Sequence, residues 1–258
     1  MERRDFFKTA LWAGIGAGTA FSQTELAERF LVLEWYRCRR DQDLARMRGF
    51  LGESLVPAYG RAEIRPVGVF QTSVGPDNPS FLVLSSYASL ASVQDARGKL
   101  EGDGKWSQDC RAFDEKWELA YDRIESSLLR GFRTLPGIET PKVEEGKSNL
   151  FELRIYESRN AAGHEKKVAM FNSGEIEIFR RCGIHPVFFG STMFGSRMPN
   201  LTYMVWYPTW DARAAAWSKF SQDPEWKKMS AAPGNADREL VSSISNQLMT
   251  PLAFSQIR

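Results

Sequence analysis

Apolar residues along the chain follow two periods, one typical of strands and one typical of helices, and the order of these periods occurs twice. Runs rich in apolar, aromatic and β-branched residues indicate strands at 31–38 and 151–158. The first run is followed by the apolar stripe of an amphipathic helix, at Leu44, Met47, Leu51 and Leu55. The second run is followed by a less regular stripe, at Val168, Phe171, Glu175 and Ile178.

Two further strands are predicted after each helix, at 64–73 and 81–87 in the first half and at 184–193 and 201–207 in the second. Each pair is joined by a loop of Gly, Pro and Asn residues that ends one strand and permits a reversal. Ser89 and Thr209 predict the N-caps of a second helix, because a hydroxyl can accept from an unpaired N–H of the first turn. A last strand is predicted at 124–132 and 244–252. The order strand, helix, strand, strand, helix, strand is that of a ferredoxin-like unit.

The chain repeats itself at a constant offset of 120 residues, so that 30–136 aligns with 150–256 without a gap. Between 33–106 and 153–226, 15 of the 74 aligned positions are identical. Such a unit has helices on one face of its sheet and leaves the other face bare, and a second copy can cover that face. The fold class is therefore predicted as α+β, with two tandem ferredoxin-like βαββαβ units forming one intramolecular barrel about a pseudo-twofold axis. Residues 137–149 are predicted to be the linker.

The composition and charge of the chain argue against a nucleic-acid partner. Apolar residues make up 43% of the 258 residues and charged residues 26%, as in an ordinary soluble protein. Lysine and arginine number 34 against 32 acidic residues, and apart from a cluster at 37–40 they are scattered. Because nucleic-acid binding usually shows as a concentrated basic face, no nucleic-acid partner is predicted.

The cysteines and histidines do not suggest a metal site. Cys38, Cys110 and Cys182 lie far apart and in none of the short spacings that hold a metal, so we expect no metal centre and interpret them as buried structural thiols. The two histidines are separated by twenty residues, which gives little support to a catalytic triad. His164 is expected to be exposed, near a helix start. His185 begins a strand, and a lone histidine in such a place is more often a hydrogen-bonded structural residue than a catalytic one.

The N-terminus resembles an export signal. Arg3 and Arg4, followed by an apolar residue and Lys8, resemble the twin-arginine motif, and a weakly apolar stretch of 13 residues follows at 9–21. Small residues at Ala20 and Ser22 suit a signal peptidase, so residues 1–22 are interpreted as a signal peptide. The mature protein is then expected to be periplasmic or secreted, without stable membrane insertion. The alternative is the ordinary N-terminus of a cytoplasmic protein.

Several short motifs of the second unit resemble the NIPSNAP family of dimeric α/β-barrel proteins. They are Phe-Glu-Leu-Arg-Ile-Tyr at 151–156, Trp-Tyr-Pro at 206–208, Ser-Gln-Asp-Pro-Glu-Trp at 221–226 and Pro-Leu-Ala-Phe-Ser at 251–255. The first unit departs from the pattern, with Glu34 in place of the usual Arg and Gly-Lys in place of Pro-Glu at 104–105. The resemblance implies the barrel fold. Family members are linked mainly to protein interaction and organelle turnover in animals, and related barrels include cofactor-free monooxygenases and haem-handling enzymes.

The pleat of the first strand of each unit suggests candidate site residues. Alternation sends Leu153 and Ile155 toward the helices, which would leave Arg154 and Tyr156 pointing into the barrel. The same argument points Glu34 and Tyr36 inward. Glu34 and Arg154 are equivalent positions of opposite charge, so we predict an ion pair between them across the pseudo-twofold axis, flanked by Tyr36 and Tyr156. The pair either fixes the register of the two halves or lets Arg154 anchor an anionic or carbonyl ligand.

Aromatic residues are dense in the second unit, where Trp206, Tyr207, Trp210, Trp217 and Trp226 fall within 21 residues. Trp210 and Trp217 are expected to share a helix face and to serve packing rather than a ligand cage. Trp206 and His185 join Glu34, Tyr36, Arg154 and Tyr156 as candidate pocket residues.

The sequence favours an exported protein that binds a small molecule or a protein partner through its barrel, and it allows a homo-oligomer. The alternative is a cofactor-independent monooxygenase-like enzyme, which would orient a carbanion-forming substrate inside the barrel. A deep cavity lined by Arg154, Tyr156 and His185 would favour the enzyme, whereas a barrel filled with side chains would favour the interaction protein. No cofactor is indicated by a motif; the only glycine-rich run, at 14–18, lies in the signal segment.

The export signal predicts a change of location on substitution. Replacing both Arg3 and Arg4 by Lys keeps the charge but removes the paired guanidinium groups of the motif, so the full-length precursor should accumulate in the cytoplasmic fraction. Cell fractionation with immunoblotting measures this. Processed protein in the periplasm of the double variant at the native level would contradict the assignment of 1–22.

Overall fold

The computed structural model describes residues 26–38, 41–115, 120–142 and 149–258, and the predicted signal peptide lies outside them. The strands of the first unit are β1 (Phe30–Arg37), β2 (Val67–Val74), β3 (Ser80–Tyr87) and β4 (Arg123–Gly131). Its helical segments are α1 (Asp41–Phe50), η1 (Leu51–Leu55), α2 (Val56–Arg61), α3 (Leu90–Glu101) and α4 (Gly104–Asp114).

The second unit repeats this order. Its strands are β5 (Leu150–Ser158), β6 (His185–Phe194), β7 (Asn200–Tyr207) and β8 (Val241–Pro251). Its helical segments are α5 (Ala161–Met170), η2 (Phe171–Glu175), α6 (Ile176–Cys182), α7 (Trp210–Gln222), α8 (Pro224–Ala231) and the short α9 (Asp237–Leu240). Within the part of the chain that is described, no helix is long and apolar enough to cross a membrane.

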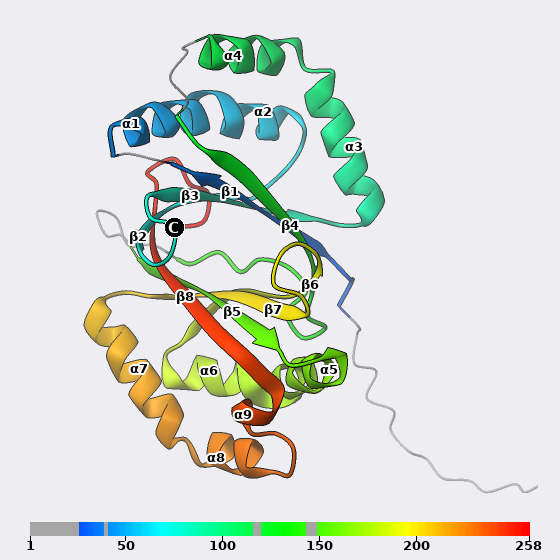
Figure 1. Cartoon of the computed structure of the whole chain (residues 1–258), viewed down its shortest axis with the longest axis vertical. Coiled ribbons are helices and arrows are strands. Elements are labelled where there is room, and N and C mark those ends of the chain that lie inside the picture. The colour runs from blue at the N-terminus through cyan, green and yellow to red at the C-terminus, as the bar shows by residue number, and fades with distance from the viewer. Residues whose placement is uncertain (1–25, 39–40, 116–119, 143–148) are drawn as a thin grey trace, which may run out of the picture.

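The eight strands close into one barrel in the order β1-β3-β2-β8-β5-β7-β6-β4. Two antiparallel ladders join the units, β2 with β8 and β4 with β6. Each unit places its helices outside the barrel, so the strands lie between two helical layers (Figure 1). This confirms the predicted βαββαβ duplication and the intramolecular barrel. Closure leaves neither sheet with a free edge.

Helix starts follow the caps that the sequence indicates. The Ser89 hydroxyl accepts from the N–H of Ser92 before α3, and the Thr209 hydroxyl accepts from the N–H of Ala212 before α7. Asp223 caps α8, with Pro224 in its first turn. Within each first helical layer one turn is widened to a π-helix, at 51–55 and again 120 residues later at 171–175.

The predicted orientation of β1 and β5 is wrong. Leu31, Leu33 and Trp35 of β1 and Leu153 of β5 belong to the apolar cluster that fills the barrel, which draws its strand residues from all eight strands. Tyr36 and Tyr156 belong instead to the two clusters under the helices. Both faces of these strands are buried, so apolar residues occur on both, and alternation alone does not tell which face is which.

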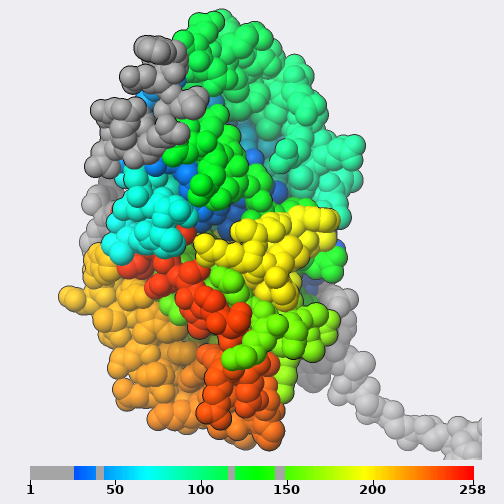
Figure 2. Space-filling model, viewed as in Figure 1, coloured from blue at the N-terminus to red at the C-terminus, as the bar shows by residue number. Residues whose placement is uncertain are grey.

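The barrel is packed with apolar side chains at one end and is polar at the other. The C-terminal residues close the apolar end, where Ile257 is fully buried and Gln256 and Ser255 hydrogen-bond to the first residues of β2, before its pairing with β8 begins. The β2–β3 and β6–β7 hairpins stand at the opposite end, on the face that Figure 2 presents in cyan and yellow. The described start of the predicted linker, at 137–142, lies against the second unit, because the N–H of Glu139 donates to the carbonyl of Val187.

A buried charge cluster holds the helical layer of the second unit together. The Lys167 ammonium on α5 lies 3.2 Å from both carboxylate oxygens of Glu175 and 3.1 Å from Asp237 Oδ1. The aromatic ring of Trp226 lies 5.1 Å from the same ammonium. Burial raises the pKa of the Glu175 carboxyl to about 7, against the attraction of Lys167. The first unit carries Met47 and Leu55 at the corresponding positions.

These counterparts define a double-substitution experiment. Lys167→Met leaves Glu175 buried without its cation, and Glu175→Leu deprives Lys167 of its nearest carboxylate. Each single variant should lose about 3–5 kcal/mol of unfolding free energy, whereas the pair together should cost much less. Urea unfolding followed by circular dichroism measures the three variants against the native protein. Additive losses in the double variant would contradict a coupled ion pair.

Candidate functional site

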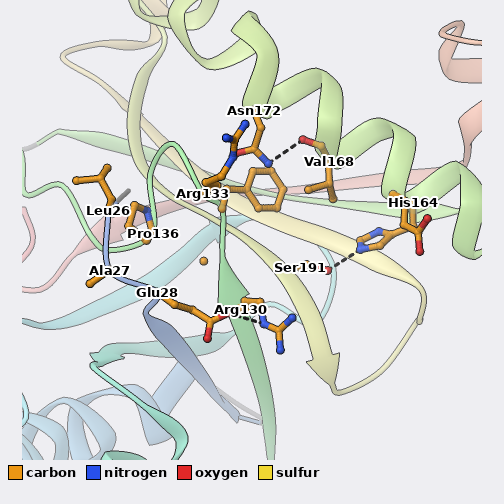
Figure 3. Close-up of a pocket in the computed structure, with 13 residues that line it drawn as sticks. Leu26, Ala27, Glu28, Arg130, Arg133, Pro136, His164, Val168, Asn172 and Ser191 are labelled. Carbon is orange, nitrogen blue, oxygen red and sulfur yellow. Dashed lines mark hydrogen bonds and ion pairs between the residues drawn. The ribbon is translucent and has the colours of Figure 1, made fainter. Parts of the chain in front are cut away.

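A cavity of about 620 Å³ lies at the junction of the two units, between the start of the described chain and α5 (Figure 3). His164 is half-buried there, contrary to the prediction that it is exposed. Its Nε2 lies 2.5 Å from Ser191 Oγ, and its Nδ1 lies 3.4 Å from Ser158 Oγ. Burial lowers the pKa of His164, so the imidazole is neutral at pH 7. Each ring nitrogen of His164 therefore has a serine hydroxyl as its hydrogen-bond partner, which is a structural role.

A second cavity, of about 540 Å³, lies between the sheet and the helices of the first unit. We call it the first-unit cavity. It contains two of the candidate residues, Glu34 and Tyr36, and its walls come from β1, η1, α2, the end of β3, α3 and α4. Its lining residues are Val32, Glu34, Tyr36, Leu55, Tyr59, Tyr87, Val93, Arg97, Leu100, Glu101, Trp106, Ser107 and Cys110.

Polar groups converge on Glu34 in the first-unit cavity. The Tyr59 hydroxyl donates a short hydrogen bond to Glu34 Oε2. Burial and the neighbouring Glu34 carboxylate raise the pKa values of Tyr36 and Tyr59 well above the usual value for tyrosine. Burial also raises the pKa of Tyr87, whose hydroxyl accepts from Ser85 Oγ at 3.3 Å. The three phenols therefore stay protonated and can serve as hydrogen-bond donors around one carboxylate.

The same place in the second unit is occupied by side chains. At the 120-residue offset, Glu152 takes the place of Val32, Arg213 that of Val93 and Trp217 that of Arg97. Arg213 Nε and Nη2 each donate to the Glu152 carboxylate at 2.8 Å, and Trp217 Nε1 donates to it at 3.1 Å. A hydrogen bond from Asn246 at 3.0 Å completes the set. Glu152 is completely buried.

Arg154 belongs to this network and not to a cavity. Its Nη1 donates to Glu152 at 2.7 Å, and its guanidinium lies 4.6 Å from the Trp217 ring. Tyr156 accepts from Arg154 at 3.4 Å and from the Tyr203 hydroxyl at 3.0 Å. The predicted pair between Glu34 and Arg154 is therefore wrong, because each side chain points to the helices of its own unit and finds its partner there.

The remaining candidates lie elsewhere. His185 and Trp206 are cross-strand neighbours on β6 and β7, with ring centroids 4.5 Å apart, and Trp206 packs against the apolar end of the barrel. Burial lowers the pKa of His185. Trp210 is 53% exposed, so the prediction that it packs on one face with Trp217 is wrong.

No group of three or more His, Cys, Asp or Glu side chains able to hold a metal ion occurs among the described residues. Cys38 and Cys182 are buried, as predicted. Cys110 is half-buried and lines the first-unit cavity. The cavity thus offers two carboxylates, Glu34 and Glu101, together with phenolic donors, a thiol and, at its exposed edge, Arg97.

Tyr59, Tyr87 and Arg97 were not singled out from the sequence. Tyr87 is identical with Tyr207, which on its own indicates a shared structural role. The positions that differ between the two units indicate the cavity more clearly. At the 120-residue offset, Arg97 aligns with Trp217 and Val93 with Arg213, so the first unit has smaller or exposed side chains where the second has large, packed ones.

The Glu152 network makes the free energy of unfolding depend on pH in the acid range. Burial alone would raise the pKa of Glu152, but the hydrogen bond from Arg213 and the charge of Arg154 outweigh it and set the pKa at about 2. A carboxyl whose pKa is lowered on folding contributes stability above its unfolded value of 4.5, and this contribution is lost as the pH falls toward 2. Glu152→Gln should therefore cost about 3 kcal/mol at pH 7 and flatten the loss of stability between pH 5 and 2.

Urea unfolding at each pH measures this effect. Glu177→Gln, which changes a 74% exposed carboxylate, provides the matched control and should keep the native pH profile. An unchanged acid-dependent slope in Glu152→Gln would contradict the role given to this carboxylate.

Comparison with known proteins supports the fold over most of the chain. A candidate monooxygenase from Fusobacterium nucleatum subsp. nucleatum is 7% identical and superposes with a TM-score of 0.58, covering 88% of this chain and 94% of that one. An anthrone oxidase-like protein is 10% identical, with a TM-score of 0.54 and coverages of 87% and 91%. At these identities the likeness shows the fold alone.

A NIPSNAP-like domain protein from Burkholderia xenovorans is 22% identical, covering 42% of this chain and 88% of that one with a TM-score of 0.38. No curated protein matches the chain in sequence. The NIPSNAP family model matches residues 41–136 and again 151–256, and these two stretches make up most of the 258 residues. The chain therefore belongs to the NIPSNAP family and carries two tandem copies of its domain.

Proposed function

We propose that this protein binds a small hydroxylated aromatic molecule in the first-unit cavity. The observation that carries the proposal is the contrast between equivalent places in the two units. In the second unit Arg213 and Trp217 close over a buried carboxylate, whereas in the first unit Val93 and Arg97 line an open space of about 540 Å³. A cavity of this size accommodates a molecule of two or three fused rings.

The chemistry of the walls selects the ligand class. Val32, Leu55, Val93, Leu100 and Trp106 supply apolar and aromatic surface. Glu34 accepts hydrogen bonds only, and its present donor is the Tyr59 hydroxyl. A ligand hydroxyl can replace that phenol with a chemically similar donor, which favours a phenol over a carboxylate. Arg97, at the exposed edge, suits a carbonyl or second oxygen of the ligand.

A cofactor-independent oxygenase is the second candidate, and Glu34 is the observation that favours it. A carboxylate beside protonated phenols can take a proton from an acidic C–H or O–H of a bound aromatic, and the phenols can donate to the resulting oxyanion. The anion formed by loss of a C–H proton would then be oxidised by dioxygen: one oxygen atom ends as a ring carbonyl on that carbon, and the other leaves as water with the two hydrogens that the carbon has lost. Monooxygenase and anthrone oxidase are named among proteins of this fold, but their identities of 7% and 10% make this support indirect.

Binding is tested by titration calorimetry with 1-naphthol, and naphthalene serves as the matched molecule without a hydroxyl. The native protein should bind 1-naphthol more tightly than naphthalene. Arg97→Trp copies the second unit and should fill the cavity and abolish binding. Glu34→Gln removes the charged acceptor and should weaken binding about tenfold or more. Ala91→Trp introduces the same ring at an exposed position of the same helix and should bind as the native protein does.

The outcomes separate the hypotheses. Failure of both naphthyl probes to bind, or equal binding by Arg97→Trp, would overturn the proposed site. Consumption of dioxygen with anthrone that is lost in Glu34→Gln would establish the oxygenase, whereas binding without consumption would leave a binding protein. Native mass spectrometry of protein exported by its own pathway identifies a ligand that co-purifies.

We also propose, from the paired arginines at 3–4 and the apolar stretch at 9–21, that the protein acts outside the cytoplasm. A protein partner instead of a small molecule would be expected to cover the opening of the first-unit cavity.

A further inference from the structure

A third cavity, of about 480 Å³, opens at the hairpin end of the barrel. We call it the barrel-mouth pocket. It lies on the pseudo-twofold axis, because both the β2–β3 hairpin, through Asp77, and the β6–β7 hairpin, through Arg197, contribute to its rim. Both hairpins stand on the face shown in Figure 2. Trp35 and Ile155, which are equivalent positions, form part of its apolar floor.

A buried polar layer separates the apolar end of the barrel from this pocket. Thr192 and Thr202 donate to Asn200 Oδ1 at 2.6 and 3.1 Å, and Asn200 Nδ2 donates to the carbonyls of Ser196 and Arg197 at 2.9 and 3.2 Å. Gln247 accepts from Thr72 at 3.4 Å through its oxygen, which leaves its amide nitrogen to donate. Polar side chains that are this deeply buried normally have a structural or a ligand partner.

The loop carrying Arg197 is held in an unusual conformation. Arg197 has a φ of 60°, a value that residues other than glycine adopt infrequently, and the two hydrogen bonds from Asn200 fix the loop in this form. The equivalent Asp77 has a φ of 55°. Backbone strain of this kind clusters at binding and active sites, and here it occurs on both sides of one pocket.

The charges of the rim are not balanced. Arg37 and Arg123 lie against Glu125 at 2.7 and 3.1 Å, with Asp77 close to both, so these four groups neutralise one another. Arg197 is the fifth charged group of the lining. Its nearest carboxylate, Glu157, is 3.9 Å away and outside the pocket, and its other contact is the Ser245 hydroxyl at 3.2 Å. The lining residues therefore include one more positive than negative charge, and the extra charge, Arg197, has only the long contact to Glu157 as its ion pair.

The space itself comes from a difference between the units. The tip glycine of each hairpin packs against the opposite unit: Gly75 lies against Gln247, and Gly195 lies against Ser127, the counterpart of Gln247. A glutamine at 127 would extend into the pocket from the first-unit side. Ser127 therefore leaves open a volume that Gln247 fills on the other side.

From this arrangement we infer that the barrel-mouth pocket is a second binding site, separate from the first-unit cavity, for a small hydroxylated monocarboxylate. Arg197 binds the carboxylate, because a guanidinium matches its two oxygens. The Gln247 amide and the serine and threonine hydroxyls of the wall bind the hydroxyl groups, and the ring of Trp35 packs against the carbon chain. A neutral polyol lacks the charge for Arg197, and an aliphatic acid lacks the hydroxyls for the polar wall.

Titration calorimetry at low salt tests the inference with D-gluconate and D-glycerate as probes. D-sorbitol, which lacks the charge, and acetate, which lacks the hydroxyls, are the matched controls. At least one hydroxy acid should bind with a Kd at or below about 1 mM, and both controls should bind at least tenfold more weakly. Arg97→Trp, which fills the first-unit cavity, should leave this binding unchanged.

Three variants separate a binding role from a structural one. Arg197→Gly removes the charge at a position where glycine is favoured by the backbone, so binding should fall at least tenfold while the unfolding midpoint stays equal or rises. Arg197→Lys keeps the charge and should retain part of the affinity. Ser127→Gln should fill the pocket and abolish binding.

The inference is overturned if neither hydroxy acid binds below about 10 mM, if acetate binds as tightly as D-gluconate, or if Arg197→Gly binds as the native protein does. None of these results bears on the first-unit cavity, whose probes are uncharged aromatics. Should Ser127→Gln unfold, the two Arg197 variants still decide the matter.

Discussion

Strand pairing between the two units is the interaction on which the rest of the structure depends. The ladders of β2 with β8 and of β4 with β6 are the places where one unit's sheet continues into the other's. Without them each sheet would expose two edges and one half-apolar face to water. Closure fixes a pseudo-twofold axis along the barrel, which in turn places both hairpins at one mouth. It also places the two helical layers on opposite sides of the barrel (Figure 1).

The two units share a backbone fold but differ in the residues that lie under their helices. In the second unit the positions under the helices carry Glu152, Lys167 and Glu175, each paired with a cation or anion of the same unit. The first unit has Val32, Met47 and Leu55 at these positions. One copy therefore uses buried ion pairs to fix its helical layer, and the other keeps a cavity there, with Glu34, Arg97 and Glu101 in its lining.

The fold could be predicted from the sequence because duplication supplies two independent observations of each element. Caps at Ser89 and Thr209, a shared offset for every strand and a bare sheet face together leave few alternatives to a barrel. The faces of β1 and β5 could not be assigned in the same way. Their two sides are both buried, so Leu33 and Tyr36 are equally suited to either face. Glu34 and Tyr36 were found as candidates, but their cavity depends on helices whose side chains the sequence does not place.

Covalent fusion of the units has a consequence for assembly. A barrel made from two separate chains falls apart on dilution, whereas here the second half is always present at the effective concentration set by the residues between β4 and β5. Fusion also allows equivalent positions of the two units to carry different residues. In a pair of identical subunits a substitution occurs twice, so Ser127 could not face a differently sized Gln247, nor Asp77 an Arg197. The single chain can therefore hold an asymmetric centre within a symmetric frame.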